Sequence, residues 1–482
     1  MLSVICFFAQ FKGFILSQSI QQGASTAFAS LPLKQDLLDN LKTMNFEAMT
    51  QIQAQSLPTI LAGDDVIAQA KTGSGKTAAF GLGLLNKLDV KRFRIQTMVL
   101  CPTRELADQV AKEIRTLARG THNVKVLTLC GGVPMGPQIG SLEHGAHIIV
   151  GTPGRIVDHL DRNRLDLSNV NMLVLDEADR MLEMGFQDQL DQIVAEMPHE
   201  RQTLLFSATF PEQIKTVADQ IMYKPTMVKV ESTHDDLTIE QKFYLIEDGQ
   251  GRTEALELLL LDRQPESAVV FCNTKRETQK VADTLAGKGF SVLALHGDLE
   301  QRDRDKMLLQ FANKSARVLV ATDVAARGLD IDALDAVFNY HIAYDTEVHI
   351  HRIGRTGRAG STGVAYTFFS NEDAYKVSLI EDAMGKAIVE TPLPSSSVLT
   401  QQPIEAEMVT IQIDAGKKHK IRPGDIVGGL TGENGIAGTD IGKIKVTDIR
   451  SYVAVNRFAA KKALNKITNG RLKGKTYRAW FL

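Results

Sequence analysis

Two short segments of this chain carry residues suited to phosphate chemistry. The first, residues 70–77, reads Ala-Lys-Thr-Gly-Ser-Gly-Lys-Thr and follows an apolar run at residues 66–68. Small residues in such a loop let backbone N–H groups converge on phosphate oxygens, while the lysine reaches the outer phosphates and the last hydroxyl ligates a metal. The residues expected to hold the nucleotide phosphates are Thr72, Gly73, Ser74, Gly75, Lys76 and Thr77.

The second segment, residues 176–179, reads Asp-Glu-Ala-Asp and follows the apolar run at residues 172–175. Carboxylates just past a buried strand lie at the edge where an α/β sheet binds its ligand. Asp176 is then expected to hold Mg²⁺ with Thr77, and Glu177 to orient or deprotonate the attacking water. The loop alone departs from the strict pattern, because Ala70 stands where that pattern has glycine. The two segments together predict a nucleoside-triphosphate hydrolase.

A guanine-binding alternative comes from residues 86–89, which read Asn-Lys-Leu-Asp. This is the guanine-recognition signature of GTPases, but here it falls in the helix that follows the phosphate loop. A guanine reader must come from the end of a later strand. We therefore interpret residues 86–89 as a coincidence on a helix surface.

The elements that must position these residues alternate between strand-like and helical patterns. In the first half, strand-like runs occur at residues 97–100, 124–128, 147–150, 172–175 and 203–206. In the second, they occur at residues 268–272, 291–295, 318–321, 336–339 and 364–368. Such alternation is typical of βαβ units and predicts parallel sheets covered by helices on both faces.

The domain boundaries follow from polar and Pro/Ser-rich breaks in this pattern. A polar stretch at residues 231–236 separates the two α/β halves, and residues 391–397 form a Pro/Ser linker. The last segment reads as a small βαββαβ domain, with strand-like runs at 409–413, 441–446, 452–455 and 476–481 and helices from Pro423 and near 458–467. The predicted parts are a disordered extension at 1–25, domains at 26–231 and 232–385, a linker at 386–403 and a third domain at 404–482.

Composition places the chain among ordinary globular proteins of the cytoplasm. Its 482 residues are 44% hydrophobic and 23% charged, and a chain of this length suggests about three domains. Its four cysteines show no metal-ligand spacing, and Cys101 and Cys272 fall in or beside strand-like runs, so we expect buried free thiols. Lys12 interrupts the apolar N-terminal stretch well short of the ~20 residues that a membrane span needs. We expect no membrane partner, with a membrane tether as the minor alternative.

The net charge of −2 hides a strong asymmetry along the chain. Residues 401–482 contain fifteen Lys and Arg against seven Asp and Glu, so this segment carries +8 and the rest −10. A basic segment attached to an acidic body is typical of a nucleic-acid-binding appendage. The plainer alternative is a solvated basic face on an ordinary domain. Because the bias falls within one bounded segment, we favour binding.

Residues 26–385 resemble the DEAD-box RNA helicases, and the motifs quoted above stand in that family's order. The resemblance implies two RecA-like parallel-sheet lobes, ATP and Mg²⁺ as cofactors, and RNA-dependent ATP hydrolysis. It also implies that Gln53 reads adenine, with Phe46 beside it and Phe28 as the stacking aromatic. The family usually has proline near residues 48–49, where this chain has Ala-Met; we expect no loss of the amide contact.

Further motifs carry the implied RNA contacts and the implied coupling to nucleotide state. Residues 102–106, 131–132 and 152–155 each follow a strand-like run, and their glycines and arginines suit contacts to the RNA backbone. The second lobe contributes residues 296–304, 321–323 and 351–358. By resemblance the RNA-contacting residues are Arg104, Gly132, Thr152, Arg155, Arg304 and Thr322. The coupling residues implied in the same way are Asp179, Ser207 and Thr209. The implied arginine fingers are Arg355 and Arg358, and Asp330 is the implied ribose ligand.

The last domain resembles an RRM-like rRNA-binding domain found in bacterial members of this family that act in large-subunit ribosome assembly. The matching stretches are residues 414–425, 440–444 and 474–476. The resemblance implies 23S rRNA and pre-50S particles as partners, and a motor tethered by a hairpin near the peptidyl-transferase centre. The run at residues 450–455 lacks the aromatic-rich consensus that stacks bases, and Tyr452 is its one aromatic, so we do not expect base stacking on the sheet face. We expect basic loops and helix ends to bind the hairpin, with Lys417, Lys418 and Lys420 as candidates.

Two rival functions share part of this pattern. An ATP-gated RNA clamp that nucleates a complex without unwinding would carry every motif above, and the rRNA-binding tail favours a roving assembly factor over it. A DNA motor is disfavoured by the match to RNA-specific motifs, because A-form RNA is read through its backbone and 2′-hydroxyls. We expect a monomer that acts on RNA rather than DNA.

Overall fold

The computed structural model describes residues 26–70, 73–230, 239–247, 251–326, 334–357 and 363–482. The chain divides into two compact units after Thr233. The expected extension at residues 1–25 lies outside the described residues, as do Thr72, Asp330 and Arg358.

The first unit is built on a parallel sheet of seven described strands in the order β3-β4-β2-β5-β6-β1-β7. Each central strand is a short apolar run, as expected for strands that are buried on both faces. The strands are β1 (Val66–Gln69), β2 (Thr97–Leu100), β3 (Val126–Leu129), β4 (Ile148–Gly151), β5 (Met172–Asp176), β6 (Gln202–Ser207) and β7 (Thr226–Lys229).

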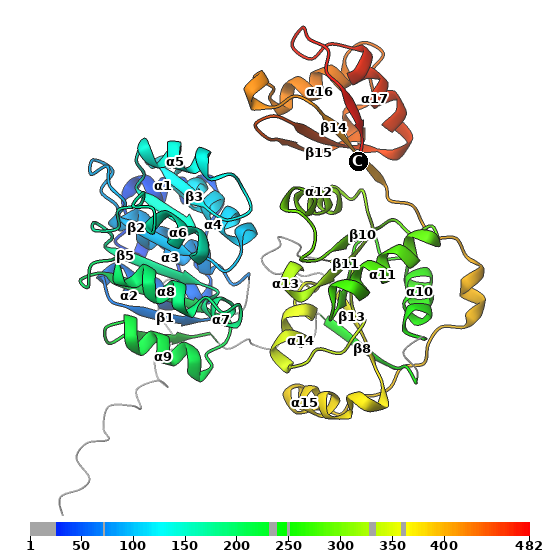
Figure 1. The fold of residues 1–482 in the computed structure, drawn as a ribbon, viewed down its shortest axis with the longest axis horizontal. Coiled ribbons are helices and arrows are strands. Elements are labelled where there is room, and N and C mark those ends of the chain that lie inside the picture. The colour runs from blue at the N-terminus through cyan, green and yellow to red at the C-terminus, as the bar shows by residue number, and fades with distance from the viewer. Residues whose placement is uncertain (1–25, 71–72, 231–238, 248–250, 327–333, 358–362) are drawn as a thin grey trace, which may run out of the picture. The chain divides into compact units, whose positions relative to one another are not determined.

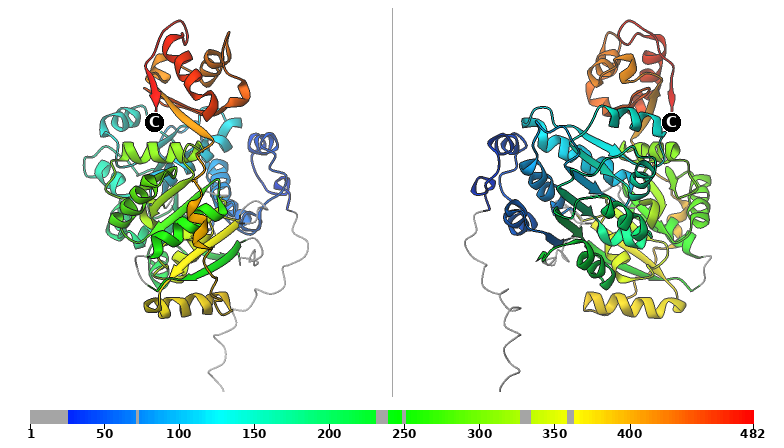
Figure 2. Two further views of the ribbon diagram at one scale, coloured as in Figure 1. Left: turned by 90° about the vertical axis from the view of Figure 1, so that its right-hand side faces the viewer. Right: turned by 60° about the vertical axis from the view of Figure 1, so that its left-hand side comes forward.

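Helices cover both faces of this sheet (Figure 1, Figure 2). Side chains of β5 alternate between the two resulting cores: Met172 and Val174 belong to one, and Leu173 and Leu175 to the other. The helices are α1 (Gln35–Thr43), α2 (Gln51–Ala62), α3 (Lys76–Lys87), α4 (Arg104–Leu117), α5 (Met135–Glu143), α6 (Pro153–Leu160), α7 (Ala178–Glu183), α8 (Gln187–Ala195) and α9 (Glu212–Ile221).

The second unit contains another parallel sheet, with six described strands in the order β10-β11-β9-β12-β13-β8. Its strands are β8 (Ile239–Leu245), β9 (Ala268–Cys272), β10 (Val292–Leu295), β11 (Val318–Thr322), β12 (Ala336–Asn339) and β13 (Gly363–Phe369). Its helices are α10 (Gly251–Arg263), α11 (Lys275–Gly287), α12 (Gln301–Ala312), α13 (Asp323–Ala326), α14 (Thr346–Ile353) and α15 (Ala374–Met384). We refer to this part as the second lobe, and to the first unit as the first lobe.

The C-terminal domain has an antiparallel sheet of four described strands in the order β15-β16-β14-β17. Two helices pack on one face of it, so the segment has the predicted βαββαβ order. The fold class expected from the sequence, two parallel α/β sheets and a small antiparallel domain with helices, is confirmed. The elements are β14 (Met408–Ile413), α16 (Pro423–Thr431), β15 (Ile441–Val446), β16 (Ser451–Asn456), α17 (Ala460–Asn469) and β17 (Ala479–Phe481).

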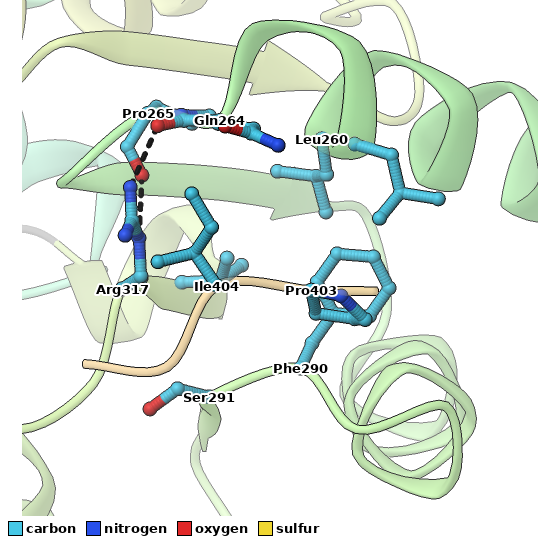
Figure 3. A pocket seen from close by; sticks show the side chains of 10 residues that line it. Leu260, Gln264, Pro265, Phe290, Ser291, Arg317, Pro403 and Ile404 are labelled. Atoms are coloured by element: carbon cyan, nitrogen blue, oxygen red, sulfur yellow. Dashed lines mark hydrogen bonds between the residues drawn. The ribbon is translucent and has the colours of Figure 1, made fainter. Parts of the chain in front are cut away.

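The segment between α15 and β14 lies along the second lobe. Thr391 N–H donates to the Phe243 carbonyl at 2.7 Å, and Val398 packs with Leu258 and Leu261. Further on, Pro403 and Ile404 line a small pocket with residues of the second lobe, beside the bonds from Arg317 to the carbonyls of Gln264 and Pro265 (Figure 3). This linker is therefore fixed to the second lobe along its length.

One strand of the C-terminal domain bonds directly to the second lobe. Thr410 on β14 is 1% exposed, and its Oγ1 accepts from Asn313 Nδ2 at 3.1 Å. The Ser315 hydroxyl lies 2.7 Å from the same oxygen. These contacts cover one end of the sheet face that points away from α16 and α17.

Candidate nucleotide site and RNA-facing residues

The phosphate loop joins β1 to α3 and contains two glycines in the left-handed backbone conformation. Gly73 and Gly75 have φ of +81° and +93°, a left-handed conformation that costs a side-chain-bearing residue free energy. Lys76 is buried, and its Nζ donates to the Ala70 carbonyl at 2.7 Å. The Ser74 hydroxyl is buried without a hydrogen-bond partner among the described residues. An orphaned buried hydroxyl in this loop is what a bound phosphate oxygen would satisfy.

Gln53, predicted to read adenine, connects the start of α2 to the phosphate loop. Its Oε1 accepts from the Thr50 N–H at 2.9 Å, and its Nε2 donates to the Gly75 carbonyl at 3.1 Å. A Cβ at Gly75 would lie 2.5 Å from that Nε2, so a side chain there would displace the Gln53 amide from its present position. Gln53 is buried, and these two bonds fix the loop against the start of α2; its reading of adenine stays a prediction.

Phe28, predicted to stack on adenine, lies beside Phe46 of the predicted adenine-reading segment in the first lobe. The rings of Phe28 and Phe46 are 6.4 Å apart with an interplanar angle of 23°. Phe28 is buried and belongs to the core cluster that contains Phe80. The alternative guanine signature at residues 86–89 lies at the end of α3, where the Asn86 side chain bonds the backbone of Lys34 and Pro32.

Asp176 and Glu177 lie at the carboxyl end of β5 and are both buried. Burial raises the pKa of the Asp176 carboxyl to about 7; the charge of Lys76 opposes this rise and that of Glu177 adds to it. Glu177 has φ of +53°, an uncommon backbone conformation for a residue with a side chain and one that clusters at functional sites. Its Oε2 forms a 3.2 Å ion pair with Arg180 Nη1. Glu177 is thus fixed in both backbone and side chain.

The side chain of Asp179, in the helix that follows β5, hydrogen-bonds to the residues that follow β6. Its Oδ2 accepts from the N–H groups of Ala208 and Thr209 at 3.2 and 3.0 Å, and from the Thr209 hydroxyl at 3.0 Å. Burial acts to raise the pKa of Asp179, but the hydrogen bonds from Thr209, the nearby Ser207 hydroxyl and the charge of Arg180 outweigh it and leave the pKa low. The buried Ser207 hydroxyl nonetheless falls short of hydrogen-bond geometry to any described residue. The predicted coupling residues are therefore brought together, with Thr209 making the direct bonds.

One predicted RNA-contacting residue of the first lobe, Arg155, bonds to Gln138, which the sequence did not single out. Arg155 donates to the Val133 carbonyl at 3.1 Å and to Gln138 Oε1 at 3.0 Å. Gln138 Nε2 donates to the Cys130 carbonyl at 2.9 Å, and His159 Nε2 lies 3.0 Å from Gln138 Oε1. Gln138 thereby joins the end of β3 to α6.

The remaining three predicted RNA-contacting residues of this lobe occupy loop and helix ends. Thr152 is the N-cap of α6, Gly132 has φ of +72°, and Arg104 pairs with Asp108 at 3.9 Å. All lie beyond the carboxyl ends of β2, β3 and β4. Backbone N–H groups and arginines at such ends suit contacts to phosphate oxygens.

In the second lobe, Arg352 makes side-chain hydrogen bonds to several elements. The sequence analysis predicted no role for it. It is 1% exposed and forks onto Asp323, with Nε and Nη2 each 2.7 Å from a carboxylate oxygen. Its Nη1 also donates to the His341 carbonyl at 2.7 Å. Bidentate pairing of this kind fixes geometry strongly. Arg352 therefore holds the start of α13 against the end of α14, next to Arg355.

The predicted residues of the second lobe lie near these elements. Arg355 is buried, and its carbonyl accepts from the Leu334 N–H at 3.1 Å. Arg304, on α12, bonds the Ala325 carbonyl at 3.4 Å, and Thr322 ends β11 with its Oγ1 3.4 Å from the Ala325 N–H. Arg304 and Thr322 are thus both tied to α13.

The three candidate lysines of the C-terminal domain project from a fixed loop. The N–H groups of Lys417 and Lys418 donate to the carbonyls of Thr447 and Asp448 at 2.9 and 2.8 Å. All three lysine side chains are exposed, and Lys420 has φ of +58°. The backbone is therefore rigid while the cationic ends stay in solvent.

The structure describes no helix long and apolar enough to cross a membrane within its assigned ranges. Of the cysteines, Cys101, Cys130 and Cys272 are free and buried. No group of three or more His, Cys, Asp or Glu suited to a metal ion is found among the described residues.

Comparison with known proteins agrees with this arrangement. The chain matches the family DEAD/DEAH box helicase at residues 50–217, Helicase conserved C-terminal domain at 251–360 and DbpA RNA binding domain at 410–480. It is 53% identical to the ATP-dependent RNA helicase DbpA of Escherichia coli over 95% of this chain and 100% of that protein. It is 42% identical to the DEAD-box ATP-dependent RNA helicase CshA of Bacillus subtilis, over 80% of this chain and 78% of that protein.

Two solved structures show the same fold over most of the chain. Dbp5 of Saccharomyces cerevisiae bound to RNA and ADP BeF3 superimposes with a TM-score of 0.68 at 30% identity, covering 76% of this chain and 96% of that one. Mss116p bound to ssRNA and AMP-PNP gives 0.67 at 28% identity, covering 76% and 78%.

Proposed function

The chain belongs to the DEAD-box ATP-dependent RNA helicases, and we propose that it separates short rRNA duplexes during assembly of the 50S ribosomal subunit. In this proposal the C-terminal domain binds a 23S rRNA hairpin near the peptidyl-transferase centre, and the lobes act on a neighbouring helix. The match of residues 410–480 to the DbpA RNA binding domain supports that role.

The observation that carries the proposal is the set of buried charged groups at the carboxyl edge of the first sheet. Lys76, Glu177 and Asp179 are all buried there, and the hydrogen bonds and ion pairs described above hold them. Lys76 neutralises the outer phosphates of ATP, and Glu177 orients the attacking water and takes its proton. Asp179 passes the state of the site to the end of β6 through Thr209.

Mg²⁺ is the metal that this site would hold, with Thr77 and Asp176 as its ligands. Hydroxyl and carboxylate oxygens are the donors that Mg²⁺ prefers. Burial raises the pKa of the Asp176 carboxyl to about 7, so a bound cation would favour its ionised form. When bound, the ion supplies charge neutralisation at the phosphate oxygens.

The second lobe completes the reaction. Arg355 and Arg358 act as arginine fingers on the transferred phosphoryl group, a contribution worth about 10³–10⁵ in rate in related hydrolases. Asp330 holds the ribose, and Gln53, Phe46 and Phe28 select adenine. Because the set is divided between two lobes, hydrolysis requires them to close, and ATP and RNA both favour closure.

RNA binds through its backbone to both lobes, at the RNA-contacting residues named above. The enzyme acts as a cytoplasmic monomer on RNA rather than DNA, because A-form geometry and 2′-hydroxyls are what such contacts recognise. Tethering by the C-terminal domain raises the local concentration of the substrate helix without new chemistry.

The test is ATP turnover by the intact chain with four nucleic acids. These are a 23S rRNA fragment that contains the hairpin, the same fragment with a scrambled hairpin, a plain single strand, and a DNA copy of the first fragment. We expect strong stimulation by the first alone. Equal stimulation by all three RNAs would reduce the proposal to a general RNA helicase, and stimulation by the DNA copy would contradict RNA selectivity.

A further inference from the structure

Gln138, on α5, joins the loop that follows β3 to helix α6 through its side-chain amide. It is 8% exposed. Its Nε2 donates to the Cys130 carbonyl at 2.9 Å. Its Oε1 lies 3.0 Å from Arg155 Nη1 and 3.0 Å from His159 Nε2. The amide therefore spends both lone pairs of its oxygen, and one N–H, on neighbouring protein groups.

The orientation of this amide follows from the chemistry of its partners. A guanidinium can only donate and a backbone carbonyl can only accept, so the amide oxygen faces Arg155 and the nitrogen faces Cys130. His159 Nε2 must then donate to the same oxygen. Arg155 and His159 are four residues apart on α6 and lie on one face of that helix. One glutamine oxygen thus gathers two donors from one face of α6.

Arg155 is held at most of its N–H groups and keeps one for a ligand. Besides the bond to Gln138, its Nη1 and Nη2 each donate to the Val133 carbonyl at 3.1 Å, and its Nε lies 3.4 Å from Asp158 Oδ2. Because a guanidinium has five N–H groups, one N–H of Nη2 is left without a hydrogen-bond partner among the residues that the structure describes. The side chain is 11% exposed, so the guanidinium reaches the surface from a fixed position.

The same contacts fix the loop after β3 at both ends. The Cys130 carbonyl at its start bonds Gln138, and the Val133 carbonyl at its end bonds Arg155. Between them Gly132 is exposed and has φ of +72°, so its backbone is open to a ligand. Gln138 therefore links an exposed glycine and a surface arginine that are both predicted to contact RNA.

We propose that Gln138 is a positioning residue for RNA binding, which holds Arg155 and the loop after β3 in one fixed arrangement toward the RNA backbone. This inference rests on the proposed function, which assigns Arg155 and Gly132 to that backbone, and it adds the residue that sets their geometry. Gln138 is itself buried and acts through Arg155. Donors that are fixed before the ligand arrives lose less conformational entropy on binding, and this is the contribution that Gln138 makes.

The test compares two RNAs on the intact protein in the presence of AMP-PNP. One is the hairpin with a single-stranded extension long enough to reach the lobes, and the other is the hairpin alone. The anisotropy of labelled RNA measures both affinities. Gln138→Leu removes the amide and keeps a side chain of similar size. We expect it to weaken binding of the extended RNA by about tenfold, the value of one hydrogen bond to a charged group, and to leave binding of the hairpin alone unchanged.

Salt dependence separates positioning from a general loss of structure. Gln138→Leu changes no charge, yet it should reduce the slope of log K against log salt concentration by about 0.7, the value of one phosphate contact on a single strand. Arg155→Ala should reduce the slope equally. In the double variant the affinity should be no lower than in Arg155→Ala alone, because both changes remove the same contact.

Two further variants serve as controls. Gln192→Leu removes an exposed glutamine whose Nε2 bonds Asp161, at the other end of α6, at 2.7 Å; it should bind both RNAs as the parent does. Gln138→Glu keeps an acceptor for Arg155 and His159, and it should recover most of the affinity lost in Gln138→Leu. The affinity of Gln138→Leu for AMP-PNP without RNA should match that of the parent, because β1 and the phosphate loop lie near the opposite edge of the sheet from β3.

The inference would be overturned if Gln138→Leu kept the salt slope of the parent, or if the loss in the double variant were the product of the two single losses. Equal losses for the two RNAs, or for Gln138→Leu and Gln192→Leu, would also overturn it. If Gln138→Leu does not fold, Gln138→Glu decides, because a loss equal to that of Arg155→Ala would contradict the proposal. If the hairpin alone fails to bind the parent, the proposed function fails, while the extended RNA still tests Gln138.

Discussion

In the first lobe, the charged residues of the nucleotide site are buried, whereas the candidate RNA-binding residues of the C-terminal domain are exposed. Lys76, Asp176 and Glu177 are each less than a tenth exposed; Lys76 bonds the Ala70 carbonyl at 2.7 Å, and Glu177 pairs with Arg180 at 3.2 Å. Lys417 and Lys418 extend into solvent from a fixed backbone. Buried groups act at full electrostatic strength but must be placed by the fold, while exposed cations act weakly, additively and in a salt-dependent way.

The largest expected effect comes from a substitution at Glu177, in the buried nucleotide site. We expect Glu177→Gln to lower ATP turnover by about 10³, within the range for loss of a general base, while ATP binding and RNA clamping remain. Single-turnover hydrolysis and nucleotide-dependent RNA binding measure the two effects separately. Glu196→Gln, a change at an exposed carboxylate that follows α8, is the matched control. Normal turnover in Glu177→Gln would remove Glu177 from the reaction.

The exposed surface should respond to charge removal in a graded way. Replacing Lys417, Lys418 and Lys420 together with alanine should weaken hairpin binding by about tenfold to a hundredfold. It should also reduce the slope of log K against log salt concentration by about two to three, because each phosphate contact contributes about 0.7–0.9. Turnover at saturating RNA should stay near normal. RNA anisotropy at several salt concentrations measures both quantities.

The control for this triple variant removes the same charge elsewhere in the domain. Lys461, Lys462 and Lys466 on α17 replaced with alanine should leave the hairpin affinity and its salt slope closer to those of the parent. Identical losses in the two triple variants would mean that the domain attracts RNA by its net charge alone, with no defined patch.

The smallest effect concerns the partly buried hydrogen bond between Asp179 and Thr209. Thr209→Val removes the 3.0 Å hydroxyl bond to a charged group, which should lower the free energy of unfolding of the first lobe by about 1.5–3 kcal/mol at neutral pH. The folded pKa of Asp179 is lowered, so its stabilisation is present above the unfolded pKa of about 3.9 and is lost as the pH falls through the folded value. The difference between parent and variant should therefore hold from pH 8 to 5 and shrink below about pH 4.

Urea unfolding followed by circular dichroism at several pH values measures this difference. Thr209→Ser, which keeps the hydroxyl, should restore most of the stability. A cost that stays constant into acid would assign the loss to packing around the Thr209 methyl group instead of to the charged bond.

Much of the first lobe's site was predictable because short motifs and sheet topology determine it together. In a parallel sheet the carboxyl ends of all strands meet at one edge, so residues that follow β1, β5 and β6 must converge there. That is why Lys76, Glu177 and Asp179 could be named from the sequence. Gln138 and Arg352 could not, because a glutamine on a helix or one arginine among several gives no signal until its partners are known.

Two strands were also missed for a physical reason. β7 and β8 are edge strands of their sheets, and each mixes exposed with buried residues. An edge strand needs no continuous apolar run, because one of its sides faces solvent. The apolar runs that located the central strands therefore did not mark them.

The sequence by itself determined the family, the order of the motifs and the placement of the candidate catalytic groups at one sheet edge, because these depend on short spacings and on parallel topology. Only the tertiary structure decided which residues meet across long separations: Gln53 with Gly75, Arg352 with Asp323, and Tyr452 with Gln412 and Trp480. The last set depends on antiparallel register, which is set by packing and by hydrogen bonds between distant strands, and a shift of one residue would turn every one of these side chains to the other face.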